Sequence, residues 1–290
     1  MYHDSLGFWK HLLKQGLDED GWQWDWTTLG ISSQAKPSIR AEVIAKSEGV
    51  WAASDLVKAL SQFSDENGVQ VCAQSEYQDG QKLVAGSRVM TLEGSSRLVL
   101  ALERPFLNLA SYVSGIATST RRLVDQVKSV AKGQAPRVTS TRKILPGYRD
   151  LAIHGVRAGG GYAHRVSLSG GVLIKENHIA AAGGIEKAIR LVSEQAPHGL
   201  KIEVEVRSLS ELSEALSSGA EAVLLDNFTP RDVVQAVVLI RKHSKPIVVE
   251  VSGGLSEENI AEFVIEGVHV LSSGSLTHSV KAVDLSLLVK

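Results

Sequence analysis

Residues 201–230 read KIEVEVRSLSELSEALSSGAEAVLLDNFTP, a stretch with two short apolar runs separated by a polar, helix-like segment. The runs Lys201–Val206 and Ala222–Leu225 have the length and composition of buried strands. Between them, Ser208 and Glu211 have the spacing of a capping box, which marks the start of a helix. Because a helix between two buried strands makes a parallel crossover, this stretch predicts an α/β fold.

The same alternation continues on both sides of this unit, from Gly133 onward. Four more strands are predicted, at Arg137–Thr141, Gly171–Ile174, Pro246–Val251 and Val268–Leu271. Thr229-Pro230 places proline at a first helical position, and Ser256 precedes a predicted helix that runs through Val264. Six parallel strands favour a barrel-like closure over an open sheet, although the pattern is compatible with both.

The N-terminal part has a different pattern, in which short strand-like runs are separated by turn residues between Arg40 and Glu103. The predicted strands are Ala41–Ala45, Val69–Ala73, Lys82–Ala85 and Arg88–Leu92, with turns at Asp79-Gly80 and Glu93-Gly94. Apolar residues then recur at helical spacing from Leu107 to Val127, which predicts a long helix between the two parts. We therefore expect a small α+β domain over residues 1–113 and an α/β-barrel domain over residues 114–290, whose C-terminal segment can pack back on the first domain.

The charge balance argues against a protein that binds nucleic acid or a membrane surface. The chain has 290 residues, and its 31 basic and 32 acidic residues give a formal net charge of −1. This leaves no excess positive field for a phosphate backbone or an anionic membrane. Met1–Leu17 has the pattern of a short amphipathic helix rather than of a signal peptide, and no apolar run approaches the roughly 20 residues of a membrane span. With the single cysteine Cys72, which fits a reducing compartment, these features predict a cytoplasmic protein.

Polar side chains follow the predicted strands at the point where each strand ends. In a β/α barrel these positions meet at one mouth, so they indicate what lines a site. In chain order they are Thr141, Arg142, Lys143, His164, Arg165, Lys175, Glu205, Asp226, Ser252, Gly253, Gly254, Ser273 and Gly274. Taken singly, a cation is usually solvated, Asp226 is compatible with a helix cap and His164 with a structural histidine. Their occurrence at equivalent strand ends indicates a binding site for anions.

Two glycine-containing turns, Ser252-Gly253-Gly254 and Ser273-Gly274, each lead into a predicted helix. Backbone N–H groups at helix N-termini bind phosphate, and the loops after the last two strands are the usual phosphate site of barrel enzymes. Glu203 and Glu205 lie on one face of a predicted strand, and the pattern does not choose between them. Residue chemistry alone thus predicts an enzyme that acts on a phosphorylated substrate with further negative charges.

The chain also resembles a known enzyme family in a series of short motifs. In chain order these are ERPFLN (103–108), SGIAT (114–118), TRKILPG (141–147), VRAGG (156–160), HR (164–165), LIKENHI (173–179), EVEV (203–206), LDNF (225–228), VSGG (251–254) and GSLTHS (274–279). Together they are similar to the motif series of quinolinate phosphoribosyltransferases and follow it in the same order. The resemblance implies an N-terminal α+β domain, an incomplete α/β barrel of the type II phosphoribosyltransferase kind, and a homodimer or a larger homo-oligomer.

The activity that this resemblance implies is the conversion of quinolinate and phosphoribosyl pyrophosphate into nicotinate mononucleotide, pyrophosphate and carbon dioxide, a step of NAD biosynthesis. The pyridine nitrogen would attack the anomeric carbon as pyrophosphate leaves. The quaternised nitrogen would then stabilise the carbanion that forms when the neighbouring carboxylate departs. Mg²⁺ is the expected cofactor, and since pyrophosphate supplies most of its oxygens, no direct protein ligand is expected.

The resemblance also implies roles for the cations of the predicted site. Arg142, His164, Arg165 and Lys175 would bind the two carboxylates of quinolinate, a task that suits the bidentate geometry of arginine. Lys143 and Lys175 would face the pyrophosphate and count among the catalytic residues.

Three further sets of residues complete this implied site. Glu205 and Asp226 would be catalytic, because they would address the ribose hydroxyls and lie near the magnesium, where carboxylates stabilise oxocarbenium-like charge. The turns that contain Ser252, Gly253, Gly254, Ser273 and Gly274 would bind the 5-phosphate. Arg104 would reach the site of the neighbouring subunit.

Some positions depart from the family pattern. Trp22, Trp24 and Trp26 stand where small or aliphatic residues are usual, and tryptophans at this spacing favour strand or interface packing. Ser140 and Ile144 replace a usual acid and a usual threonine, which bears on fine substrate preference. Two alternatives are a same-fold paralogue linked to molybdenum transport, with a different substrate, and a catalytically silent binding protein. The retained cations argue against the first alternative, and the retained catalytic carboxylates against the second.

Overall fold

The structure, a computed structural model, describes residues 5–31, 36–64, 68 and 70–290. The chain divides into two compact units. The first comprises Met1–Ser119, Asp150–Gly160 and Val280–Lys290, and the second comprises Thr120–Arg149 and Gly161–Ser279. In the part of the chain described, no helix has both the length and the apolar character of a membrane span.

The first unit contains a four-stranded antiparallel sheet in the order β12-β1-β5-β3. Its strands are β1 (Ser38–Ala45), β3 (Cys72–Ser75), β5 (Arg88–Ser95) and β12 (Leu285–Val289), and a separate ribbon pairs β2 (Gly49–Val50) with β4 (Lys82–Leu83). The helices of this unit are α1 (Ser5–Asp20), η1 (Trp22–Trp24), α2 (Trp26–Ile31), α3 (Ser54–Leu60), most of α5 (Arg149–Ala158) and the first part of α4 (Ser96–Val130). This is the expected α+β unit, and α4 is the expected long helix, although it already begins at Ser96.

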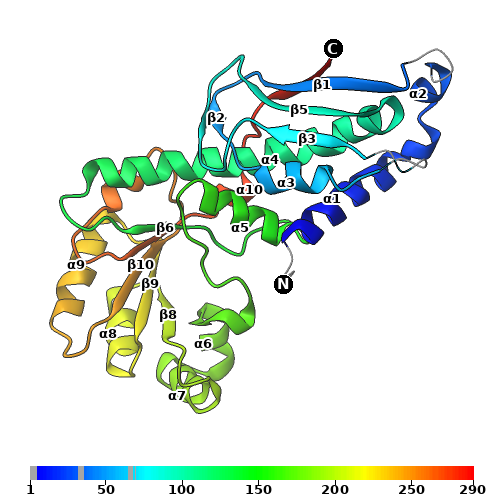
Figure 1. Ribbon diagram of the computed structural model, residues 1–290. Helices are drawn as coiled ribbons and strands as arrows, with labels where there is room; N and C mark the ends of the chain where they lie inside the picture. Colours follow the sequence, from blue (N-terminus) through cyan, green and yellow to red (C-terminus); the bar gives the residue numbers. More distant parts are fainter. Residues whose placement is uncertain (1–4, 32–35, 65–67, 69) are drawn as a thin grey trace. The chain divides into compact units, whose positions relative to one another are not determined.

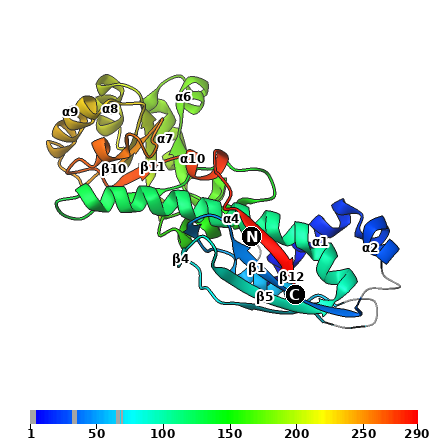
Figure 2. The same cartoon turned by 90° about the horizontal axis from the view of Figure 1, so that it is seen from above.

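The C-terminal strand β12 completes the sheet of the first unit, because it lies beside β1 with Ala41 opposite Val289 (Figure 2). The segment that leads to this strand passes close to α4. A Cβ atom added at Gly115 would lie 2.5 Å from the carbonyl oxygen of Lys281, so only glycine allows this approach. The packing of the C-terminal segment therefore depends on the small residue in the SGIAT motif.

The second unit contains a six-stranded parallel sheet in the order β6-β11-β10-β9-β8-β7. Its strands are β6 (Arg137–Thr139), β7 (Val172–Ile174), β8 (Ile202–Val206), β9 (Ala222–Asp226), β10 (Val248–Ser252) and β11 (Val270–Ser272). Its helices are α6 (Glu176–Ala182), α7 (Ile185–Gln195), α8 (Leu209–Ser217), α9 (Pro230–Arg241) and α10 (Ser275–His278), with η2 (Leu168–Gly170) and η3 (Ile260–Phe263). Helices α6 to α9 lie around strands β8 to β10 (Figure 1). Since β6 and β7 end the sheet without pairing to each other, the expected incomplete α/β barrel is confirmed.

Buried aliphatic residues hold the helices of the second unit to its sheet. Val204 and Val223 on the strands belong to one buried cluster with Leu212 on α8 and Val233 on α9. Ser208 Oγ accepts a hydrogen bond from Glu211 N at 3.1 Å and so caps α8, as the capping-box spacing predicts.

Two predictions of local structure were wrong. Glu93 and Gly94 do not form a turn but lie inside β5, because β5 pairs along this stretch with β1 and, at Glu93, also with Cys72 of β3. Ser256 does not start an α-helix, since only the short helix η3 follows it. The Ser256 hydroxyl accepts from Glu258 N and its N–H donates to Asn259 Oδ1, and such local bonds compete with helical ones.

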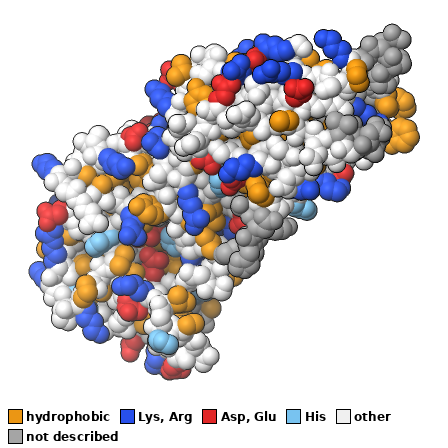
Figure 3. Space-filling model, in the orientation of Figure 1, with side chains coloured by type: hydrophobic (Ala, Val, Ile, Leu, Met, Phe, Trp, Pro, Cys, Tyr) orange, Lys and Arg blue, Asp and Glu red, His pale blue; other side chains and the backbone are white. Residues whose placement is uncertain are grey.

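The tryptophan segment near the N-terminus is helical rather than extended, so the predicted strand packing was wrong there. Asp25 Oδ1 accepts from Thr28 N at 3.2 Å and caps α2. Trp24 and Trp26 are 70% and 77% exposed, and hydrophobic side chains gather at the α2 end of the first unit (Figure 3). Trp22 is half-buried beneath Arg97, whose guanidinium carbon lies 5.4 Å from the ring centroid.

Candidate active site

A cavity of about 740 Å³ opens at the carboxyl ends of the parallel strands in the second unit. The predicted residues that line it are Thr141, Arg142, Lys143, His164, Arg165, Lys175, Glu205, Asp226, Ser252, Gly253, Gly254 and Gly274. Basic, acidic and histidine side chains are intermingled on the visible face of this unit (Figure 3). The structure thus brings together residues from six separate strand ends.

Two predicted site residues lie elsewhere. Ser273 is buried, and its hydroxyl donates to the carbonyl oxygen of Leu255 at 2.6 Å, so it braces the loop after β10 instead of lining the cavity. Arg104 belongs to the first unit, where its side chain on α4 is 63% exposed and lies 3.8 Å from the carboxylate of Glu103.

One lysine and two carboxylates line the cavity at the ends of three adjacent strands. Lys175, just before α6, forms an ion pair with the Glu205 carboxylate on β8. Asp226 ends the neighbouring strand β9 and accepts a hydrogen bond from Asn227 Nδ2 at 2.9 Å. Two carboxylates on adjacent strands therefore face a cavity that also contains lysine, an arrangement that can stabilise positive charge on a bound sugar.

The guanidinium groups of Arg142 and Arg165 place two positive charges near each other in the same cavity. Arg165 is anchored by its Nη1, which donates to the Gly171 carbonyl oxygen at 3.1 Å. Burial lowers the pKa of Arg165, and the nearby charge of Arg142 lowers it further, although both groups stay cationic. Like charges at close range suit a ligand with two negative charges, because such a ligand relieves their repulsion.

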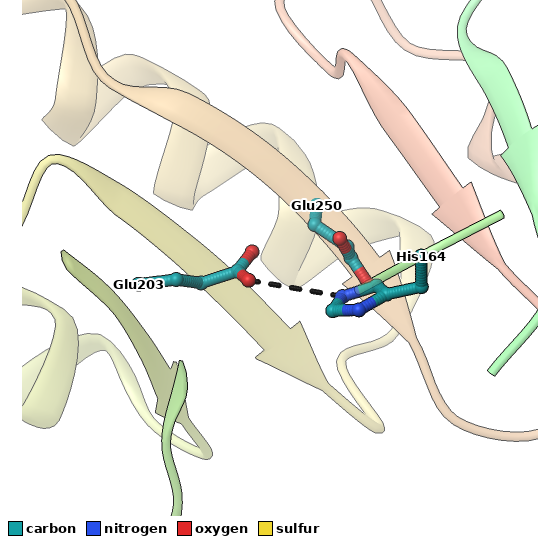
Figure 4. Close-up of side chains that lie close together, drawn as sticks. All are labelled: His164, Glu203 and Glu250. Carbon is teal, nitrogen blue, oxygen red and sulfur yellow. Dashed lines mark ion pairs between the residues drawn. The ribbon is translucent and has the colours of Figure 1, made fainter. Parts of the chain in front are cut away.

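A largely buried cluster at the cavity joins His164 to two glutamates (Figure 4). The His164 Nε2 atom lies 3.4 Å from Glu250 Oε1 and 3.7 Å from Glu203 Oε2. The His164 Nδ1 atom accepts a hydrogen bond from the Arg165 backbone N–H at 2.7 Å. Glu250 is 4% exposed and also accepts a hydrogen bond from the Ser272 hydroxyl. Both ring nitrogens of His164 are therefore occupied by protein groups.

The surroundings of this cluster shift the pKa values of Glu203 and His164. Burial, followed by the charge of Glu250, raises the pKa of Glu203 to about 7. Burial lowers the pKa of His164, but Glu250 and Glu203 outweigh it and raise that pKa above its ordinary value. The Arg165 N–H opposes the rise, because an imidazolium has no lone pair to accept it. The neutral ring with its proton on Nε2 satisfies both contacts.

A metal ion is usually held by three or more histidine, cysteine or acidic side chains. Among the described residues, the cluster of His164, Glu203 and Glu250 is the group whose ligand atoms lie close enough together for this. A metal would have to displace the Nε2 proton of His164 while Nδ1 still accepts a backbone N–H. That would require an imidazolate ring, which favours a bound proton over a metal here.

The glycine turn after β10 has a shape that no other residue type can adopt easily. Gly253 and Gly254 have φ angles of 99° and 64°, and a Cβ at Gly253 would lie 2.3 Å from Asn227 Oδ1. The expected helix N-terminus does not follow this turn, and α10 after Gly274 is a single turn. Anion binding at this position would therefore depend on the backbone N–H groups of the turns themselves.

Asn227, Ser275 and His278 also line the cavity; they belong to the LDNF and GSLTHS motifs, but sequence reasoning gave them no role. Sequence reasoning missed Glu250, which lines the cavity although no motif contains it. An acidic residue between valines in an otherwise apolar strand is costly unless it is paired, which marks it for a special role.

Comparisons with known proteins agree with this geometry. The family model of the quinolinate phosphoribosyl transferase C-terminal domain matches residues 116–288, and that of the N-terminal domain matches residues 25–114. A relative from Methanocaldococcus jannaschii, a probable nicotinate-nucleotide pyrophosphorylase [carboxylating], is 40% identical over 95% of each chain. The human nicotinate-nucleotide pyrophosphorylase [carboxylating] is 37% identical over 89% of this chain and 84% of its own.

Solved structures show the same likeness. The nicotinate-nucleotide pyrophosphorylase from Francisella tularensis matches with a TM-score of 0.85 and 32% identity over 99% of this chain and 98% of that one. NadC from Streptococcus pyogenes matches with a TM-score of 0.85 and 34% identity over 96% and 95% of the two chains. The motif series, the open barrel and these matches agree, and the chain belongs to the quinolinate phosphoribosyl transferase family.

Proposed function

We propose that this protein transfers a phosphoribosyl group from phosphoribosyl pyrophosphate to quinolinate and releases pyrophosphate and carbon dioxide, with nicotinate mononucleotide as the product for NAD biosynthesis. The observation that carries the proposal is the cavity at the strand ends, in which Arg142, Arg165 and Lys143 lie with the carboxylates of Glu205 and Asp226. Cations suit a dicarboxylate and a pyrophosphate, whereas the carboxylates suit a sugar that becomes positively charged. Relatives named nicotinate-nucleotide pyrophosphorylase [carboxylating] support the same reaction.

Quinolinate would bind against the guanidinium groups of Arg142 and Arg165. Arg165 is held by the Gly171 carbonyl and by the His164 ring, which accepts its backbone N–H. Since both nitrogens of His164 have protein partners, we expect His164 to support quinolinate binding chiefly by positioning Arg165. The ligand's two carboxylates would then meet a preformed pair of cations.

The reaction centre would lie between the lysines and the carboxylates. Lys143 and Lys175 would bind the departing pyrophosphate, and Glu205 and Asp226 would stabilise the positive charge that develops at the anomeric carbon. The ion pair between Lys175 and Glu205 holds both groups in place before substrates arrive. Ser252, the glycine turn that follows it and Gly274 would bind the 5-phosphate through backbone N–H groups.

Magnesium fits this donor set. Glu205 and Asp226 lie at the carboxyl ends of adjacent strands, near the proposed pyrophosphate subsite, so a Mg²⁺ ion whose oxygen ligands come mostly from pyrophosphate would need no protein cage there. When bound with pyrophosphate, Mg²⁺ would neutralise charge on the leaving group. The chain's own carboxylates would orient the ribose next to it.

A homodimer would complete the site with Arg104 of the neighbouring subunit. This cation is largely exposed on α4, in the family's ERPFLN motif, and belongs to the first unit, whereas the other cations of the site belong to the second. In a twofold-symmetric dimer both sites would receive the same contribution.

The test is product formation with purified protein. Quinolinate, phosphoribosyl pyrophosphate and magnesium should give nicotinate mononucleotide and carbon dioxide, detected by chromatography and by release of label from the carboxylate. Nicotinate should be a far poorer substrate, because an unfilled cationic subsite costs roughly 2 to 5 kcal/mol. Equal turnover of nicotinate and quinolinate would contradict the assignment of two carboxylate subsites.

A further inference from the structure

The turn after β9 has an unusual backbone conformation at Asn227. Its φ angle is 57°, and in the part of the chain described no other residue besides glycine has a positive φ. Side-chain-bearing residues rarely adopt this region, although asparagine tolerates it better than most. Such a conformation at the mouth of the cavity needs a reason beyond the turn itself, because a glycine would make the turn without strain.

Asn227 connects the ends of two strands. Its Nδ2 donates to Asp226 Oδ2 at 2.9 Å, and its backbone N–H donates to the Ser252 carbonyl oxygen at 2.9 Å. Asp226 and Ser252 are direct partners in the parallel pairing of β9 and β10. The Oδ1 atom lies where any side chain on Gly253 would have to be, 2.3 Å from the position of its Cβ. One side chain thus contacts both the carboxylate and the glycine turn.

Asn259 braces the same turn from its other end. Its Nδ2 donates to the Gly254 carbonyl oxygen at 3.0 Å, and its Oδ1 accepts the Ser256 N–H at 2.9 Å. One bond goes to the turn and the other to Ser256, two residues after it, and neither goes to Asp226. The two asparagines therefore offer a comparison between holding the turn alone and holding the turn together with the carboxylate.

We propose that Asn227 is a positioning residue that fixes the Asp226 carboxylate and the Ser252–Gly254 turn in one geometry, so that the ribose and the 5-phosphate of phosphoribosyl pyrophosphate bind in register. This rests on the proposed function. Donation from Nδ2 holds one oxygen of Asp226 and leaves the other for a ribose hydroxyl. Because no α-helix follows the turn, the turn is held by contacts with the side chains of Asn227 and Asn259.

Two substitutions separate the amide from the backbone conformation. Asn227→Gly keeps the left-handed turn and removes the donor, and it should lower kcat roughly tenfold, as expected for one lost hydrogen bond to a charged group. Asn227→Asp keeps the size and the tolerance of positive φ but places a second carboxylate against Asp226. We expect a larger loss of kcat at pH 8, with partial recovery towards pH 6 as the carboxylate pair takes up a proton.

The pH experiment includes every charged or titratable group near this pair. Besides Asp226, the charged or titratable groups that line the same cavity are Arg142, Lys143, His164, Arg165, Lys175, Glu205, Glu250 and His278. Wild-type profiles are therefore recorded in parallel, and only the ratio of variant to wild type is compared. Thermal melting of each variant confirms folding. If Asn227→Asp does not fold, Asn227→Gly carries the test alone.

Asn259→Ala is the matched control. It should raise the KM for phosphoribosyl pyrophosphate with little change in kcat, whereas Asn227→Gly should change both and leave the KM for quinolinate unaltered. Identical kinetic patterns for the two variants, or wild-type kcat for folded Asn227→Gly, would overturn the proposal. Wild-type protein that makes no nicotinate mononucleotide would instead contradict the proposed function, so the two failures are distinguishable.

Discussion

Replacing Glu203 by glutamine should make stability depend less on pH, because this largely buried carboxyl group ionises less readily in the folded chain than in the unfolded chain. Its pKa is raised to about 7 by burial and by the charge of Glu250. Glutamine has nearly the shape of the protonated acid and cannot ionise. The substitution therefore removes the titration while leaving His164 and Glu250 in place.

The sign and size follow from proton binding. Between its ordinary pKa of 4.5 and about 7, Glu203 keeps its proton in the folded chain and loses it in the unfolded chain, so the unfolding free energy falls as pH rises through this window. At roughly 1.4 kcal/mol per tenfold change in proton affinity, the full effect is about 3 kcal/mol.

Urea unfolding at pH 5.5 and at pH 8 measures the effect. Far-UV circular dichroism is the suitable probe, since the tryptophans all lie in the first unit and the cluster lies in the second. Glu203→Gln should lose clearly less stability than the wild type between the two pH values. Glu214→Gln, on the exposed face of α8, should keep the wild-type slope. Equal slopes for wild type and Glu203→Gln would refute the reasoning. So would an unfolding free energy of Glu203→Gln at pH 8 that lies several kcal/mol below that of the wild type.

Three further predictions concern activity. Glu205→Ala and Asp226→Ala should each lower kcat on the order of 10² to 10³-fold with little change in quinolinate binding, if these carboxylates act mainly on the transition state. Steady-state kinetics and equilibrium binding of quinolinate measure the two effects. Lost quinolinate affinity at unchanged kcat would mean that the carboxylates act in binding and not in catalysis. A chelator such as EDTA should abolish turnover and added MgCl₂ should restore it, whereas chelator-insensitive activity would contradict the part given to magnesium. Arg104→Ala and Lys175→Ala should each be nearly inactive, but refolding them together should restore about a quarter of all sites, since half of randomly paired dimers are mixed and each has one intact site. Activity that stays at the level of the separate variants, with mixed dimers present, would mean that Arg104 serves its own chain.

The sequence alone was sufficient for the architecture and for most of the cavity wall. Strand and helix periodicities are local properties, so stretches such as residues 201–230 predict their own elements. Parallel strands with helical crossovers then place their carboxyl ends together, which is why Arg142, Lys175 and Asp226 could be assigned to one site from their positions alone. The motif series added the family.

The tertiary structure decided what depends on contacts between distant segments. Glu93-Gly94 has the composition of a turn, yet pairing with β1, and at Glu93 also with β3, keeps it in a strand. Glu203 and Glu205 are equivalent in the strand pattern, but Glu203 joins the cluster of His164 and Glu250, and Glu205 pairs with Lys175. His164 meets its glutamates only because β8 and β10 flank β9 in the sheet. Burial and charge proximity arise from these long-range contacts, and they set the protonation of the site, which no local pattern in the sequence encodes.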